Sequence, residues 1–143
     1  MKIEKGNIVY HNKFGFGVVK KNDNSIIDVL FSNDTLHKLM AYNAIIEVVD
    51  TKLIDIIIQV DSKSYFDSWT LSKAKSYKSS IADIKYSNNE ISASVHGTYL
   101  YNTSIKYEKD HLRFNCDCPV SGKCKHEAAL YLKMKDIFYW SIV

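Results

Sequence analysis

The chain has 143 residues, of which 46% are hydrophobic and 13% aromatic, so it is rich enough in apolar side chains to build a packed core and is not a disordered chain. Its formal net charge is only +3, and Arg113 is its single arginine among 19 basic residues. Because bidentate reading of guanine is mostly an arginine task, this composition argues against sequence-specific DNA recognition and leaves sequence-neutral contact with phosphates open.

The start of the chain and its cysteines indicate a compartment. The run Met1-Lys-Ile-Glu-Lys-Gly alternates polar and apolar residues, which predicts no cleavable signal. No apolar run approaches the ~20 residues that are needed to span a bilayer. Three clustered cysteines without a secretion signal are typical of a reducing compartment, so we expect a cytoplasmic protein with no membrane partner.

The first fifty residues show the β-branched and aromatic periodicity of short strands. Asn22-Asp-Asn-Ser25 between two of these segments is typical of a hairpin turn. The segments that we expect to be strands are Asn7–Tyr10, Gly17–Lys21, Ser25–Phe31 and Thr35–Met40. The pattern predicts a small antiparallel β-barrel over residues 1–50.

A motif in this region resembles a known family. The runs Gly6-Asn-Ile-Val-Tyr-His11 and Lys13-Phe-Gly-Phe-Gly-Val-Val19, followed by Leu30-Phe31, Lys38-Leu39 and Ala44-Ile-Ile-Glu47, resemble the Tudor-like barrel at the C-terminus of UvrD/PcrA-type helicases, with Asn7 in place of the usual aspartate. The resemblance covers about residues 5–49. It implies protein binding through Lys13, Phe14 and Phe16, with a helicase or RNA polymerase as the partner. No phosphate-binding loop follows, so ATP hydrolysis is not implied.

Residues 51–65 are expected to connect this barrel to the rest of the chain. Two periodicities compete over residues 53–60, because Lys52, Asp55 and Gln59 share a helical face while the isoleucines alternate as in a strand. Asp50 or Thr51 as an N-cap favours the helix, and both structures stay open.

The last part, residues 66–143, begins with a helix that Asp67 or Ser68 can cap and that runs to about Tyr77. Its polar side carries Lys73, Lys75 and Lys78. A meander of four strands and a final helix follow: Ile81–Tyr86, Glu90–His96, Tyr99–Tyr107, Leu112–Cys116, and a helix at about Lys125–Phe138. Tyr99, Tyr101 and Tyr107 either stack on nucleic-acid bases or pack as half-buried strand residues.

All three cysteines lie within Asn115–Glu127 in the pattern Cys116-x-Cys118, five residues, Cys124-x-His126. Three thiolates and one imidazole complete the ligand set of a closed tetrahedral zinc site, so we predict one structural Zn²⁺. Cys116 and Cys118 suit a strand end, where residues two apart share a face, and His126 suits a helix start. A disulfide would leave the third cysteine unpaired, and a Cys/His catalytic dyad would leave the other two residues of the cluster unexplained. Both remain as alternatives to the zinc site.

The same residues resemble the SWIM zinc finger, whose signature is C-x-C, a variable gap and C-x-H. The resemblance rests on Phe114-Asn-Cys-Asp-Cys-Pro119 and Cys124-Lys-His-Glu-Ala-Ala-Leu130, and extends upstream to cover about residues 66–134.

Together these patterns predict an α+β protein: a Tudor-like barrel at 1–50, a connector at 51–65 and a zinc module at 66–143. We expect a non-enzymatic adaptor without a small-molecule substrate, contacting DNA or RNA in DNA transactions or transcription. The residues expected to contact phosphates are Lys73, Lys75, Lys78, Lys123 and Lys125. The alternative is a protein-interaction module in which the zinc only supports the fold and the barrel docks on a helicase or polymerase.

Overall fold

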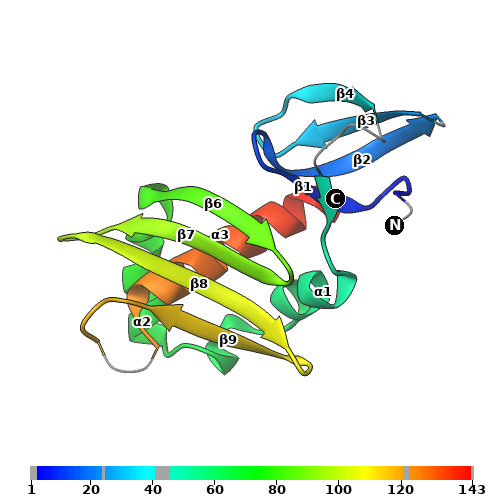
Figure 1. Ribbon diagram of the computed structural model, residues 1–143. Helices are drawn as coiled ribbons and strands as arrows, with labels where there is room; N and C mark the ends of the chain where they lie inside the picture. Colours follow the sequence, from blue (N-terminus) through cyan, green and yellow to red (C-terminus); the bar gives the residue numbers. More distant parts are fainter. Residues whose placement is uncertain (1–2, 24, 41–45, 121–122, 143) are drawn as a thin grey trace. The chain divides into compact units, whose positions relative to one another are not determined.

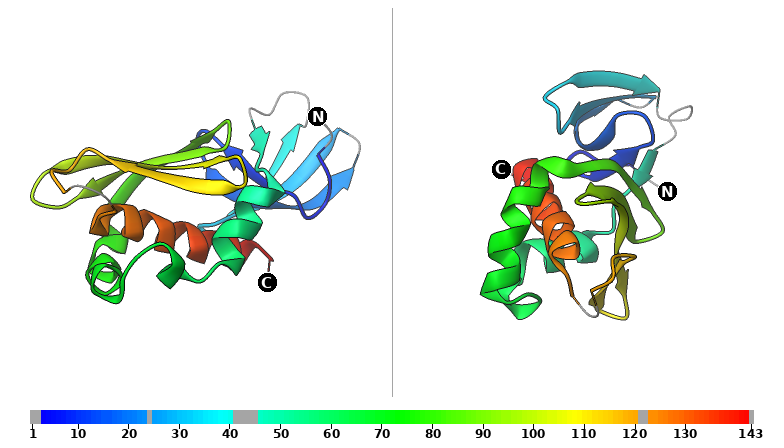
Figure 2. Two further views of the ribbon diagram at one scale, coloured as in Figure 1. Left: turned by 90° about the horizontal axis from the view of Figure 1, so that it is seen from below. Right: turned by 90° about the vertical axis from the view of Figure 1, so that its left-hand side faces the viewer.

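A computed structural model describes residues 3–23, 25–40, 46–120 and 123–142 (Figures 1 and 2). The chain divides into two compact units, here called unit 1 (Met1–Asp50 with Ile137–Val143) and unit 2 (Thr51–Asp136). Residues 51–65, expected as a connector, belong to unit 2, and the last residues of the chain belong to unit 1. The predicted α+β class is confirmed, because helices and two antiparallel sheets are present.

Unit 1 is built on a five-stranded antiparallel sheet in the order β4-β3-β2-β1-β5. Its strands are β1 (Ile8–His11), β2 (Gly15–Asp23), β3 (Ile26–Phe31), β4 (Leu36–Met40) and β5 (Ile46–Val48). The predicted closed barrel is not seen, because among the described residues the sheet ends at β4 and β5 without a pairing between them. Residues 24 and 41–45, which include part of the predicted hairpin turn and of the Ala44–Glu47 motif, lie outside the described residues.

Phe16 and Val18 are buried on one face of this sheet, and the main hydrophobic cluster of unit 1 lies on the other face, as the strand period of two requires. Its fully buried members come from β1, β2 and β3: Val9, Val19, Ile27, Val29 and Phe31. Gly17 is needed for this packing, because a Cβ there would come within 2.8 Å of the side chains of Val29 and Phe31.

Unit 2 begins with helices. The ambiguous segment is the helix α1 (Thr51–Gln59), which buries Leu53, Ile54 and Ile57 along one face. A short 3₁₀ turn, η1 (Ser62–Ser64), leads to α2 (Ser68–Ala74), which continues as a second 3₁₀ segment, η2 (Lys75–Ser80). The predicted cap is confirmed, because the Asp67 carboxylate accepts the backbone N–H of Thr70 at 2.7 Å.

The predicted meander is a four-stranded antiparallel sheet in the order β6-β7-β8-β9. Its strands are β6 (Ile81–Ser87), β7 (Glu90–His96), β8 (Leu100–Glu108) and β9 (His111–Cys116). The β6–β7 turn at Asn88-Asn89 and the β8–β9 turn at Lys109-Asp110 have positive φ at both residues, the geometry of type I′ hairpins. These tight turns set the strand register that places Cys116 at the end of β9.

The final helix, α3 (Lys125–Ile142), contributes its residues up to Asp136 to unit 2. Within unit 2, α2 and this part of α3 lie on the same side of the β6–β9 sheet (Figure 2). The buried ring of Tyr131 anchors α3, since its hydroxyl donates to the carbonyl oxygens of Ile57 and Val60, each at 3.1 Å. Burial raises the pKa of Tyr131 to about 12, so this hydroxyl keeps its proton at any ordinary pH.

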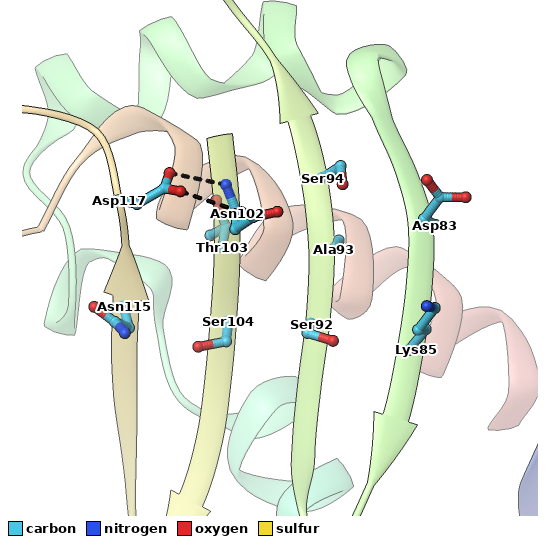
Figure 3. A pocket seen from close by; sticks show the side chains of 10 residues that line it. All are labelled: Asp83, Lys85, Ser92, Ala93, Ser94, Asn102, Thr103, Ser104, Asn115 and Asp117. Carbon is cyan, nitrogen blue, oxygen red and sulfur yellow. Dashed lines mark hydrogen bonds between the residues drawn. The ribbon is translucent and has the colours of Figure 1, made fainter. Parts of the chain in front are cut away.

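The other face of this sheet is polar and surrounds a hollow of about 460 Å³ (Figure 3). The residues that line it are Asp83, Lys85, Ser92, Ala93, Ser94, Asn102, Thr103, Ser104, Asn115 and Asp117. Ala93 and Thr103 are buried, and strand alternation turns their side chains to the opposite face. The other residues are polar or charged and suit a face that stays in water. The hydrophobic core of unit 2 therefore lies on the α3 side, where the cysteines also point.

Candidate metal centre

The first ligand pair sits where β9 ends. Cys116 is paired with Thr103 of β8, and the buried Thr103 hydroxyl donates to the Cys116 sulfur at 3.4 Å. This contact turns the Cys116 side chain toward the interior of unit 2. The strand period of two would place Cys118 on the same side, and Cys118 is only 9% exposed.

Asp117, the residue between the two cysteines, points to the opposite face and fastens the strand end to β8 (Figure 3). Its carboxylate accepts the backbone N–H of Asn102 at 2.9 Å and the Asn102 side-chain amide at 3.2 Å, while its own N–H donates to the Asn102 carbonyl at 3.2 Å. Three hydrogen bonds between these two residues hold the Cys-Asp-Cys segment, and none of them involves a cysteine sulfur.

The second ligand pair sits where α3 begins. Cys124 occupies the N-cap position, and its sulfur accepts the backbone N–H of Glu127 at 3.4 Å. In return, the Glu127 carboxylate accepts the backbone N–H of Cys124 at 3.0 Å. This reciprocal pair is a capping box in which a cysteine replaces the usual serine or threonine. Glu127 was not predicted as part of the site, although its position three residues after Cys124 is the one that a capping box requires.

The four predicted ligands come together as one cluster. One ligand atom from each of Cys116, Cys118, Cys124 and His126 lies within 4.8 Å of all the others. The His126 Nδ1 atom is 3.8 Å from both the Cys116 and the Cys124 sulfur. Tetrahedral coordination with metal–sulfur bonds near 2.3 Å and metal–nitrogen bonds near 2.0 Å needs ligand separations of roughly 3.5–3.8 Å. The residues present therefore fit one metal ion, bound through Nδ1 of His126.

The protonation of the ligands depends on the cation. Burial raises the pKa of the Cys116 and Cys124 thiols and lowers the pKa of His126, so without a metal these groups are held uncharged. A bound cation would displace the thiol protons and leave a centre of about one net negative charge. The N-terminus of α3 and the adjacent Lys123 and Lys125 offset that charge.

The His126 imidazole is oriented by packing. Tyr101 stacks on it with ring centroids 4.5 Å apart, and Tyr77 meets it edge-on at 5.3 Å. Its Nε2 atom is buried and has no hydrogen-bond partner among the described residues, and a Cβ placed on Gly97 would lie 3.1 Å from it. Hydrogen bonds from neighbouring groups usually fix a ligating histidine; here two rings and a glycine fix it. These three residues lie 25 or more positions from His126. The SWIM resemblance over residues 66–134 spans all three but gave them no role beside the histidine.

The predicted phosphate contacts fall into two groups. Lys123 and Lys125 flank the metal centre: Lys123 lies 5.3–5.9 Å from the ring centres of Tyr65, Phe66 and Phe114, and Lys125 lies 4.9 Å from that of Tyr77. The other three, Lys73, Lys75 and Lys78, lie on α2 and η2.

In this second group, Lys73 lies 4.6 Å from the ring centre of the exposed Trp69, and Lys75 is exposed. Lys78 is paired with Asp136 at 2.7 Å, so its charge is partly offset within unit 2.

The three residues of unit 1 that were predicted to contact a protein partner differ in their exposure to solvent. Lys13 is exposed, and Phe14 is half-buried between His11 and His37, with ring centroids 4.7 and 4.0 Å away. Phe16 is only 2% exposed and meets Tyr10 edge-on at 5.1 Å. Phe16 is therefore buried within unit 1 and does not lie on the predicted contact surface. Alternation along β2 turns it to the face opposite Gly17 and Val19, where the Phe138 ring of unit 1 meets it edge-on at 5.5 Å.

Comparison with known proteins adds no relative: no family model matches the chain, and no match emerges among curated proteins or solved structures. Within the part of the chain that the structure describes, no helix is long and apolar enough to cross a membrane.

Replacing Gly97 with alanine tests the packing around His126. The added methyl group would press on Nε2 and tilt the ring that Tyr77 and Tyr101 hold. Because groups that orient a metal-bound histidine are worth on the order of 10-fold or more in metal affinity, we expect a loss of about that size in Zn²⁺ or Co²⁺ titrations. The neighbouring exposed residue gives the control, Thr98→Ala, which should bind metal as the wild type does. Equal affinities for all three proteins would contradict the packing role.

The capping box is tested by a pair of variants at Glu127. Glu127→Ala removes the acceptor for the Cys124 N–H, so the free energy of unfolding should fall by about 1 kcal/mol. Glu127→Gln keeps an acceptor oxygen and removes only the charge, so it should retain most of the stability. Denaturant titrations of the metal-loaded proteins measure both effects. If the glutamine variant lost as much stability as the alanine variant, charge and not the hydrogen bond would be responsible.

Proposed function

We propose that the protein is a non-enzymatic zinc-binding adaptor that contacts nucleic acid through the surface around its metal centre. Three thiolates and one imidazole form a closed tetrahedral set that suits Zn²⁺, which would hold the end of β9 against the start of α3. With four protein ligands no position is left for a reactive water, so the metal serves structure and not catalysis.

The observation that carries the nucleic-acid proposal is the pairing of lysines with aromatic rings in unit 2. Lys123 and Lys125 lie over rings beside the metal ligands, and Lys73 lies over Trp69. Positive charge supplies the sequence-independent contact with phosphates, and rings supply stacking surfaces. Arg113 is on β9 and is bonded to Glu108 at 3.1 Å, so the single guanidinium is engaged within the protein.

The resemblances support the same setting. A SWIM-like zinc module and a Tudor-like segment similar to the C-terminus of UvrD/PcrA-type helicases imply a place in DNA transactions or transcription. The proposal therefore names DNA or RNA as the ligand of unit 2, bound without strong sequence specificity. The proposal also assigns to unit 1 the binding of a protein partner, such as a helicase or RNA polymerase.

A second candidate function, protein binding alone, is favoured by an apolar surface on unit 1. Ile26 of β3 is paired with Met40 of β4, and these residues are 46% and 45% exposed. Leu36, also on β4, is 56% exposed. Lys13 and the half-buried Phe14 lie apart from this surface, because Phe14 stacks on His37 and packs against the hydrophobic cluster on the other face of the sheet. In this candidate the zinc only supports the fold of unit 2. Partner capture that is insensitive to nuclease and to salt would favour it.

Lysine variants across a salt series test the nucleic-acid proposal. The double variant Lys73→Ala with Lys75→Ala should weaken binding of a labelled oligonucleotide and reduce the slope of log affinity against log salt by about 0.7–0.9 for each phosphate that is no longer neutralised. The matched control is Lys20→Ala with Lys21→Ala, which removes two exposed lysines of unit 1 and should leave the slope unchanged. Fluorescence anisotropy measures both. Absence of binding by the wild type at low salt would refute the proposal.

A further inference from the structure

We propose that the nucleic acid bound beside the metal centre is single-stranded, and that an unpaired base stacks on the ring of Tyr99. This inference rests on the proposed nucleic-acid function and names the class of ligand. The ligand is defined by its chemistry, a flexible phosphate chain with exposed bases, which DNA and RNA single strands share.

The first observation is the contrast among the three tyrosines of the β8 region. Tyr101 is half-buried and stacked on His126, and Tyr107 is half-buried with its hydroxyl bonded to Asp110 at 2.9 Å. Tyr99 is 72% exposed, so most of its ring faces water. Two of the three residues therefore have structural roles, and Tyr99 alone among them presents an open ring face to a base.

The second observation is how Tyr99 is held. It lies in the bend between β7 and β8, where its carbonyl oxygen accepts the Gly97 N–H at 2.8 Å. Its ring meets that of Tyr101 edge-on, with centroids 6.4 Å apart. Since Tyr101 stacks on His126, the exposed ring is braced against a metal ligand. A braced ring loses little conformational entropy when a base stacks on it.

The third observation is the charge that surrounds this series of rings. Tyr77 contacts the same imidazole edge-on, and the Lys125 ammonium lies 4.9 Å from the Tyr77 ring centre. Over residues 63–80 and 116–127 the chain carries six lysines, two aspartates and one glutamate, and Lys78 is paired with Asp136. Asp117 is already hydrogen-bonded to Asn102. Phosphates on either side of a stacked base would therefore meet mostly positive charge.

A duplex would not use these features. Its bases are stacked on one another, so an exposed tyrosine ring has no free base face to cover, and only the lysines would contribute. A second ring–lysine pair, Trp69 with Lys73, belongs to the same unit and has the same composition, with the Trp69 ring 71% exposed. Rings paired with lysines are the usual composition of surfaces that bind single strands with little sequence preference.

The experiment compares the zinc-loaded full-length protein and its Tyr99→Ala variant on four labelled probes of equal length: oligo-dT, oligo-rU, an abasic strand and a duplex. We expect the wild type to bind both single strands more tightly than the duplex. Tyr99→Ala should weaken single-strand binding by about 5- to 150-fold, because one base stack is removed. Its affinities for the duplex and the abasic strand, and its salt slope, should stay unchanged.

Three controls separate stacking from folding. Tyr99→Phe keeps the ring and should bind as the wild type does, and Tyr139→Ala removes a 58% exposed ring from unit 1 and should change nothing. Elemental analysis should show the same metal content in every variant. Wild-type binding to single strands with no effect of Tyr99→Ala would overturn the stacking inference and leave the proposed function standing. Binding to none of the probes at low salt would overturn both.

Discussion

The organisation of unit 2 depends on one constraint. Four candidate ligand atoms, from the end of a strand and the start of a helix, must meet at one point. Cys116 and Cys118 come from the end of β9, whereas Cys124 and His126 come from the start of α3. Each pair is anchored separately, by the Asp117–Asn102 hydrogen bonds on the strand side and by the Glu127 capping box on the helix side. A metal ion bound there would join two prepared halves, which would limit the ordering entropy lost on binding. Because burial raises the pKa of the thiols, the cation would also supply the charge that stabilises thiolates in this interior.

The proposed binding surface is separate from the metal but depends on it. His126 would bind the metal through one nitrogen, and its ring is a packing centre that Tyr77 and Tyr101 contact. Tyr99 and Lys125 are in turn placed by those two tyrosines. Loss of the metal would free the imidazole and with it the support for the exposed ring. A structural metal can thus affect ligand binding without touching the ligand.

Much of this arrangement could be predicted from the sequence because its signals are local. Alternating β-branched residues indicated the strands, Asp67 marked a helix start, and the Cys-x-Cys and Cys-x-His spacing identified all four ligands. Glu127 was readable from its capping-box position and was overlooked. The SWIM resemblance spans Gly97 and Tyr101 but gave them no contact with the centre, since only the tertiary fold brings them to His126. Phe16 was misplaced because the motif does not reveal that Phe138, far along the chain, covers it. The expected barrel closure depended on pairings between distant strands. The periodicities of α1 conflicted, and burial of its Leu53–Ile57 face decided for the helix.

The most direct test of the metal clamp is elemental analysis of the full-length protein purified without a chelator. Four converging ligands predict about one zinc per chain, retained through gel filtration and lost when Cys116 and Cys124 are both replaced by serine. Protein that is folded, monodisperse and free of any bound transition metal would contradict the account, because the buried thiols and the imidazole of His126 would then need another explanation.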